Sequence, residues 1–281
     1  MKNTWLLILT TILSTEVIDA QSLSWQKIFG IQIGTPQCFA ADSDGNVYAA
    51  TSLGGVYRTS DQGNTWTYST KGLPSQTSVK CMATNAAGYV FAGTYGEGVF
   101  RSTNYGIDWT QINSGINIQG TTIQIYSLLA TPSGAIFAGT FWGGVFKSTN
   151  NGDSWEPANN GLPTNQYIFA LTINGNGYLY AGGYDGFKST NNGDSWEQFV
   201  LDGDIWYLRA SLDGWLYAWT TAVGGQRSSN GGTTWTNMTI GADPQFSPRG
   251  LAVDNNSEVY ASTDIGLYYS TNHGSSWVNT S

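Results

Sequence analysis

The sequence predicts an all-β fold, a β-propeller of four-stranded antiparallel blades, with six blades expected and seven as the alternative. The nonapeptide "KSTNNGDSW" occurs twice, at 147–155 and at 188–196. Four further segments share its pattern, so the repeat runs along the chain. The chain also contains 36 glycines and 14% aromatic residues, a composition that suits many short strands joined by tight turns.

The four related segments are "RTSDQGNTW" (58–66), "RSTNYGIDW" (101–109), "RSSNGGTTW" (227–235) and "YSTNHGSSW" (269–277). All six fit the pattern Ser/Thr-x-Asp/Asn-x-Gly-x-x-Trp. Their tryptophans lie 39 to 46 residues apart, at Trp66, Trp109, Trp155, Trp196, Trp235 and Trp277. A period near 42 residues that contains several short strands is typical of propellers and solenoids.

The third repeat shows how one period divides into four strands. A first strand over 126–134 ends in a turn, a second over 135–140 alternates in hydrophobicity, and a third covers 144–149. The nonapeptide then forms a turn, and a fourth strand begins at Trp155. Four short strands joined by glycine-rich turns form one propeller blade. A period of 3.6 residues is absent, which disfavours helical folds.

The residues of the nonapeptide have structural roles. Asn150 can accept hydrogen bonds from backbone N–H groups just ahead, and Ser148 can add a second side-chain bond to the turn. Gly152 permits a positive φ without steric cost. The terminal tryptophan buries a large apolar surface, worth a few kcal/mol. The motif is therefore interpreted as a hairpin closure that each blade needs, and not as a binding site.

Six complete units can be drawn from Gln37 onward. Trp25 precedes Trp66 by one period, so the segment "SLSWQKIFG" resembles a fourth strand without its first three. It either closes a six-bladed ring or belongs to an incomplete seventh blade. That the chain is a fragment of a longer surface protein also stays open.

Residues 1–20 have the features of a secretory signal peptide. Lys2 supplies a positive charge, an apolar stretch covers 5–13, and cleavage is plausible after Ala20. Residues 21–281 are then a single propeller domain that is secreted, periplasmic or on the cell surface. No later stretch is apolar for long enough to span a membrane.

Charge and cysteine content exclude some functions. The formal charge of −8 becomes −7 without residues 1–20, and an acidic surface disfavours a nucleic-acid partner. Cys38 and Cys81 lie at matching places in the repeat, where they form either a disulfide or two small buried thiols.

The six segments resemble the Asp-box, or BNR, repeat of sialidases and of many secreted propellers. The resemblance covers essentially the whole mature chain, although only Asp61 is the aspartate of the name and asparagine replaces it elsewhere. Asparagine keeps the acceptor oxygen, so the turn should survive. The chain is also similar to propellers of the photosystem II assembly-factor type, which act as scaffolds, but the positively charged patch of that family is not visible here.

The resemblance to sialidases implies three arginines that bind a carboxylate, an acidic proton donor and a Tyr/Glu pair. Arg58, Arg101 and Arg227 all stand just before the repeated turn, where solvated strand ends are expected. Only Arg209 and Arg249 remain, and the Phe/Tyr-Arg-Ile-Pro motif is missing. Sialidase activity is therefore disfavoured.

Propeller endoglucanases that act on xyloglucan share the box, but they use two aspartates across a cleft between two propellers. The catalytic candidates of this chain are the acids of the loops between second and third strands: Glu97, Asp185 and Asp264. A glycosidase pair needs about 5 to 9.5 Å between carboxyl groups, and blades that are not neighbours should place them farther apart. No metal site and no cofactor are expected, because the single histidine, His273, has no ligand partners at suitable spacing.

Aromatic residues occupy loops in which repeats usually carry Gly and Ser. The candidate ligand-binding residues are Tyr95, Phe141, Trp142, Tyr184, Trp206, Arg209 and Trp219, with Tyr167 beside them. Exposed aromatic rings mark binding surfaces, although the same rings can fill grooves between blades. The sequence thus favours a scaffold that binds a glycan or a protein at its loop face. The alternative is a glycoside hydrolase that uses the loop carboxylates.

Overall fold

The computed structural model describes residues 36–52, 54–118, 120, 122–240, 248–263 and 266–280. Within them the chain is all β. The expected signal peptide and Trp25 lie outside the described residues. None of the described residues forms a helix of the length and apolarity needed to cross a lipid bilayer.

The strands follow one another in antiparallel meanders. The first half contains β1 (Pro36–Ala41), β2 (Val47–Thr51), β3 (Val56–Thr59), β4 (Thr67–Ser69), β5 (Val79–Thr84), β6 (Val90–Gly96), β7 (Val99–Ser102), β8 (Thr110–Gln111), β9 (Ile123–Ala130), β10 (Ile136–Thr140), β11 (Val145–Ser148) and β12 (Glu156–Pro157). The second half contains β13 (Ile168–Ile173), β14 (Leu179–Gly183), β15 (Gly186–Ser189), β16 (Glu197–Phe199), β17 (Ile205–Ala210), β18 (Leu216–Thr220), β19 (Gly224–Ser228), β20 (Thr236–Asn237), β21 (Pro248–Val253), β22 (Val259–Thr263), β23 (Gly266–Ser270) and β24 (Val278–Asn279).

Four blades are separate four-stranded sheets: β1–β4, β13–β16, β17–β20 and β21–β24. Strands β5 to β12 instead form one eight-stranded sheet, because β6 and β9 are long enough to pair at their ends, Tyr95 with Gln124 and Gly96 with Ile123. The expectation of six separate four-stranded sheets therefore differs from the observed topology. The difference arises at this single junction.

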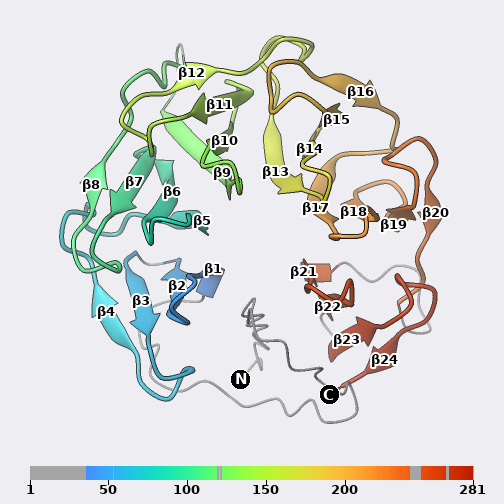
Figure 1. The fold of residues 1–281 in the computed structure, drawn as a ribbon, viewed down its shortest axis with the longest axis horizontal. Helices are drawn as coiled ribbons and strands as arrows, with labels where there is room; N and C mark the ends of the chain where they lie inside the picture. The colour runs from blue at the N-terminus through green and yellow to red at the C-terminus, as the bar shows by residue number, and fades with distance from the viewer. Residues whose placement is uncertain are drawn as a thin grey trace.

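The sheets are arranged in a ring around a central axis (Figure 1). The first strand of each meander is innermost, and each pair of neighbours from β1 through β5, β9, β13 and β17 to β21 is in contact. The short fourth strands lie at the rim and are largely exposed.

The second strands form the core. Strand β10, which the sequence predicts to alternate, is buried at all five residues, and so are β2, β14, β18 and β22. Between the first and the last meander, each blade is covered on both faces by its neighbours, so a continuous apolar run replaces the alternation expected of a half-exposed strand.

The six repeated turns share one hydrogen-bond pattern. In the turn at 148–155, the backbone N–H of Gly152 donates to Ser148 Oγ at 2.8 Å, and the N–H of Ser154 donates to Asn150 Oδ1 at 3.0 Å. The structural role predicted for these side chains is thus what the structure shows. The predicted tryptophan burial is complete at Trp109, Trp155 and Trp196, whereas Trp66, Trp235 and Trp277 are half-buried.

Each turn also contains a second residue with positive φ, which the sequence did not predict. The residue before the glycine lies near +60° in every turn: Gln62, Tyr105, Asn151, Asn192, Gly231 and His273. In three of these turns its carbonyl accepts a hydrogen bond from the preceding blade, from Arg101 to Asn151 at 2.7 Å, from Lys147 to Asn192 at 2.7 Å and from Arg227 to His273 at 2.6 Å.

Arg101 and Arg227 are therefore inter-blade links, and the expectation of solvated strand ends is wrong for them. Of the two alternatives left open for the cysteines, the structure shows the free thiols: Cys38 and Cys81 are not bridged and lie on the neighbouring innermost strands β1 and β5.

Candidate functional site

Each innermost strand carries one extra residue at the same place. The pairing register with the second strand shifts at a β-bulge, which leaves one residue unpaired between two paired ones. The bulge residues are Gln37, Lys80, Tyr126, Phe169, Trp206 and Arg249. A bulge redirects a side chain out of the normal alternation. Three consecutive bulges, on β9, β13 and β17, thus present aromatic side chains.

These three bulge residues form a continuous cluster with rings from the neighbouring loops. We call it the aromatic arc and define it as Tyr95, Tyr126, Phe141, Trp142, Tyr167, Phe169, Tyr184 and Trp206. Five of the predicted ligand-binding residues and Tyr167 are in it. Sequence reasoning missed Tyr126 and Phe169, because they lie inside strands. The signal that could have found them is an aromatic residue at the repeat position of Trp206.

The rings of the aromatic arc connect β6 to β17 across the loop face. Tyr126 lies 6.2 Å from Tyr95 and 5.4 Å from Phe169 between ring centroids. Phe169 in turn stacks on Trp206 at 4.6 Å with an interplanar angle of 1°. Tyr95, Trp142, Tyr184 and Trp206 remain 46 to 52% exposed. The arc therefore combines a packed aromatic base with rings that are open to solvent.

The arc is predominantly neutral. Burial raises the pKa of Tyr126 and of Tyr167 above the ordinary tyrosine value, and the neighbouring phenols of Tyr95 and Tyr184 add to the effect. These hydroxyls are thus protonated over the physiological pH range. Lys80 brings a positive charge to the edge of the arc, where its Nζ lies 5.6 Å from the ring centroid of Tyr95.

Trp142 has an unusual backbone. Its φ is +74°, a left-handed conformation that costs a non-glycine residue about 1 kcal/mol or more and is an outlier for a bulky side chain. Its indole N–H donates to the Tyr167 hydroxyl. Backbone strain of this kind clusters at ligand-binding sites.

A groove of about 330 Å³ lies beside Trp142. Its other walls come from the segment 162–166 and from Gly143, Gly144 and Asn159, and none of the described residues that line it is charged. Gln166 is only 5% exposed, and its Nε2 has no hydrogen-bond partner among the described residues.

Two predicted ligand-binding residues lie outside the arc. Trp219 is 8% exposed and packs in the core between the last two blades, so its prediction as a surface residue is wrong. The reason is that Trp219 pairs with Tyr207 on the face toward the next blade.

Arg209 is half-buried on β17 and pairs with Tyr217 on β18. Ala40 pairs with Tyr48 in the same way in the first blade, so Arg209 occupies a repeat position where the first blade has an alanine. Its Nη1 donates to the Leu208 carbonyl at 2.9 Å, and burial lowers the pKa of the guanidinium. The alternative pairing with Asp213 is not formed. Asp213 instead accepts from Ser211 and lies 3.6 Å from His273 Nε2.

The loop acids are not brought together as a catalytic pair. Glu97 is exposed on the β6–β7 loop, and its backbone N–H donates to Thr94 Oγ1. Asp185 is on the β14–β15 loop and accepts a hydrogen bond from Gln198 Nε2 at 2.9 Å. Asp264 lies outside the described residues. Each described acid thus has its own surroundings in a different blade.

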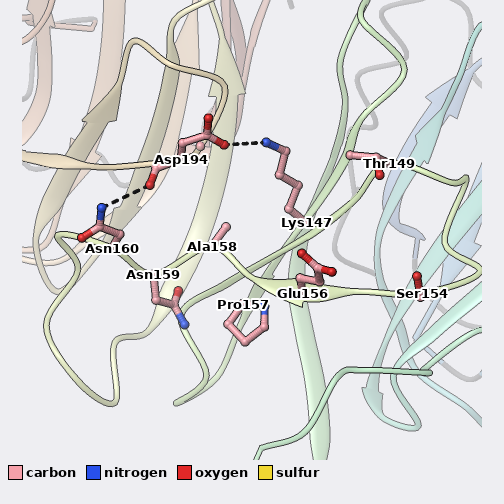
Figure 2. A pocket seen from close by; sticks show the side chains of 10 residues that line it. Lys147, Thr149, Ser154, Glu156, Pro157, Ala158, Asn159, Asn160 and Asp194 are labelled. Atoms are coloured by element: carbon pink, nitrogen blue, oxygen red, sulfur yellow. Dashed lines mark hydrogen bonds and ion pairs between the residues drawn. The ribbon is translucent and has the colours of Figure 1, made fainter.

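A second groove of about 330 Å³ lies between the repeated turn of one blade and the rim of the preceding blade (Figure 2). Lys147 Nζ pairs with Asp194 Oδ1 at 2.9 Å across it, and Asn160 Nδ2 donates to the Asp194 carbonyl at 3.3 Å. Arg101 forms an equivalent pair with Asp153 one repeat earlier. This groove therefore belongs to the inter-blade joint.

Within the described ranges, no three His, Cys, Asp or Glu side chains gather closely enough to hold a metal ion. His273 stacks on Trp215 at 4.6 Å, and its Nδ1 lies 2.9 Å from the Tyr217 hydroxyl, in a contact between the last two blades.

Comparisons with known proteins were made for sequence and for structure. The family model of the DUF6242 beta propeller domain matches residues 19–177, more than half of the chain. No curated protein sequence matches the chain.

Several solved propellers have a similar fold. YCF48 bound to D1 peptide has a TM-score of 0.71 at 16% identity, over 92% of this chain and 87% of that chain. A catalytically inactive virginiamycin B lyase from Staphylococcus aureus with quinupristin has a TM-score of 0.69 at 14% identity, over 87% and 83%. The GH74 xyloglucanase from Xanthomonas campestris has a TM-score of 0.65 at 18% identity, over 85% of this chain and 45% of that enzyme. This chain thus spans less than half of the xyloglucanase. At such identities the likeness shows the fold alone.

Proposed function

Because this chain belongs to the DUF6242 beta propeller domain family, we propose that it is a secreted or cell-surface scaffold that binds a glycan or protein ligand through the aromatic arc, without catalysis. The single observation that carries the proposal is the arc itself. Eight aromatic rings from four consecutive meanders meet on one face, and four of them remain about half exposed. Aromatic rings that stay exposed to water do not stabilise the fold, and contiguous exposed patches mark binding surfaces.

The finer architecture is part of the same proposal. The eight-stranded sheet counts as two blades that are joined at Tyr95 and Gln124, which makes six repeat units around the ring. The repeated turns are Asp-box turns, supported by the shared Ser/Thr and Asp/Asn hydrogen bonds. Residues 1–20 are a signal peptide that is removed from a single propeller domain over 21–281.

The similar structures include both binding proteins and enzymes, as the D1 peptide of YCF48 and the xyloglucanase illustrate. A glycoside hydrolase with Glu97, Asp185 and Asp264 is the rival function. The separate surroundings of Glu97 and Asp185 favour the scaffold over the hydrolase.

The test is a binding screen with the purified mature chain against a glycan array and a displayed peptide library. The double variant Tyr184→Ala/Trp206→Ala should lose the hits of the parent chain. Tyr105→Asn is the matched control, since it also removes an exposed aromatic ring, but at a left-handed turn position where two other repeats carry asparagine. Hits that survive in the double variant would overturn the proposal, as would glycan hydrolysis that is lost in Glu97→Gln or Asp185→Asn.

A further inference from the structure

The loop that holds Trp142 has a counterpart one repeat earlier. Comparing the two loops shows whether the turn itself needs a tryptophan. The loops "TYGEG" (94–98) and "TFWGG" (140–144) share their hydrogen bonds. In both, the threonine Oγ1 donates to the last glycine carbonyl, at 2.8 and 2.9 Å, and accepts from the backbone N–H three residues on, at 3.1 Å. Trp142 thus occupies the place of Gly96, whose φ is also positive.

A loop with the same threonine hydrogen bonds therefore forms with glycine, which suits a positive φ better than tryptophan does. Trp142 is 46% exposed, so it gains only part of the stabilisation that a fully buried tryptophan contributes. Its place is better explained by what the indole presents to a ligand.

The backbone donors beside Trp142 are already used. The N–H groups of Gly143, Gly144 and Val145 donate to Thr140 Oγ1, to the Gln166 carbonyl and to Asn159 Oδ1, at 3.1, 3.0 and 2.8 Å. A peptide that adds as a strand takes much of its affinity from main-chain hydrogen bonds. This loop has none of these donors left for such a ligand.

The remaining recognition groups are rings, hydroxyls and side-chain amides. Among the residues that the structure describes, the groove beside Trp142 is lined by uncharged side chains only, and these include Thr164, Asn165 and Gln166. The buried Gln166 Nε2 has no partner in the described part of the chain, so a ligand oxygen would satisfy it. With a formal charge of −8, the whole chain also repels polyanions.

We infer that this groove is a subsite for an uncharged oligosaccharide, with the Trp142 indole as the platform on which a sugar ring stacks and Gln166 as a hydrogen-bond donor to it. The inference rests on the proposed function and adds the ligand class. A sugar ring has apolar C–H faces and a rim of hydroxyls, which match an exposed indole beside neutral polar side chains.

The experiment is affinity electrophoresis of the mature chain in gels that contain a neutral polysaccharide (xyloglucan, hydroxyethylcellulose or galactomannan) or an acidic one (polygalacturonate or alginate). We expect retardation by at least one neutral polymer. Trp142→Gly should weaken it tenfold or more, while its melting temperature is equal to or above that of the parent chain. Gln166→Met keeps the side-chain length without the donor and should weaken binding severalfold, again without loss of stability.

Four results would overturn the inference. They are neutral-polymer binding that is unchanged in Trp142→Gly, binding of acidic polymers only, a clear fall in the melting temperature of Trp142→Gly, and arc-dependent binding of peptides only. The last result would leave the proposed function standing. If neither the binding screen nor the affinity electrophoresis finds a ligand that depends on the aromatic arc, both the inference and the proposed function are overturned.

Discussion

At the scale of the residue, the bulge on each innermost strand decides which side chains meet. Trp206 is an unpaired bulge residue and is 48% exposed, whereas Trp219 on the adjacent strand is paired with Tyr207 and is 8% exposed. The two tryptophans belong to one hairpin and have opposite environments. A one-residue change in register moves a side chain from one face of a strand to the other.

The first repeated turn provides a prediction on pH. Hydrogen bonds from Thr59 and Thr65 lower the pKa of Asp61 from 3.8 to about 2 in the folded chain. A carboxyl group with a lowered pKa stabilises the fold above its unfolded pKa, and this contribution is lost as the pH falls through about 2. Asp61→Asn should therefore gain stability relative to the parent chain between about pH 5 and pH 2, measured by urea unfolding.

The control for this prediction is the reverse exchange in another turn. Asn191→Asp should introduce the same loss of stability at low pH, because Ser189 and Ser195 stand where Thr59 and Thr65 do. A stability difference between Asp61→Asn and the parent chain that stays constant with pH would contradict the explanation.

At the scale of the element, a glycine in the connection between blades permits a close backbone approach. A Cβ atom added to Gly72, Gly115 or Gly161 would lie 1.9 to 2.1 Å from the carbonyl oxygen of a tryptophan in the next blade. The tryptophans are, in the same order, Trp109, Trp155 and Trp196. The backbone N–H of each tryptophan donates a hydrogen bond to the carbonyl of the residue before the corresponding glycine, at 2.9 Å. The connection is thus held against the next blade by its backbone.

Gly115→Ala tests this contact against a matched control. Gly115 has a φ of +93° and meets the Trp155 carbonyl, whereas Gly134 has a φ of +90° and nothing within 4 Å. Gly134→Ala should cost about 1 kcal/mol of unfolding free energy through backbone strain alone, and Gly115→Ala about 2 kcal/mol more through the clash. Chemical denaturation measures both, and equal losses would contradict a role for the close approach.

The two cysteines provide a further prediction for neighbouring strands. Burial raises the pKa of Cys38 to about 12 and that of Cys81 well above its ordinary value, so neither thiol forms the reactive thiolate at pH 8. Ellman's reagent should detect no thiol in the native chain and two in the unreduced, denatured chain. A denatured chain without thiols would instead show the disulfide.

At the scale of the whole molecule, the ring brings distant repeats to one face. Tyr95 and Trp206 are separated by more than two repeats in sequence, yet only Tyr126 and Phe169 lie between them in the row of ring contacts. The innermost strands are neighbours around the axis (Figure 1). The loop face therefore collects side chains that no single blade could hold together.

The neutral character of the proposed subsite predicts how binding depends on salt. Because an uncharged sugar does not interact with the net charge of −8, its affinity should change less than about twofold between roughly 0.05 and 0.5 M NaCl. Titration calorimetry with an oligosaccharide of the retarding polymer measures this. A fall of tenfold would indicate a charged ligand group.

Much of the local structure could be predicted from the sequence. Asn150, Gly152 and their counterparts predicted the repeated turns. This was possible because an Asx turn and a positive φ depend on neighbours within five residues. Six of the eight arc residues were found because aromatic side chains replace Gly and Ser in loops. The burial of Trp219 was not predicted, and the choice between a disulfide and two thiols was left open, since both depend on how one blade faces the next.

By itself, the sequence determined the repeat, its four short strands and the turn chemistry, since these interactions act over a few residues. Only the tertiary structure decided that Tyr126, Phe169 and Trp206 stand on bulges, that β6 and β9 join two meanders, and that Trp142 faces an uncharged groove. Those features depend on strand register and on the packing of neighbouring meanders, which bring together residues one or more repeats apart.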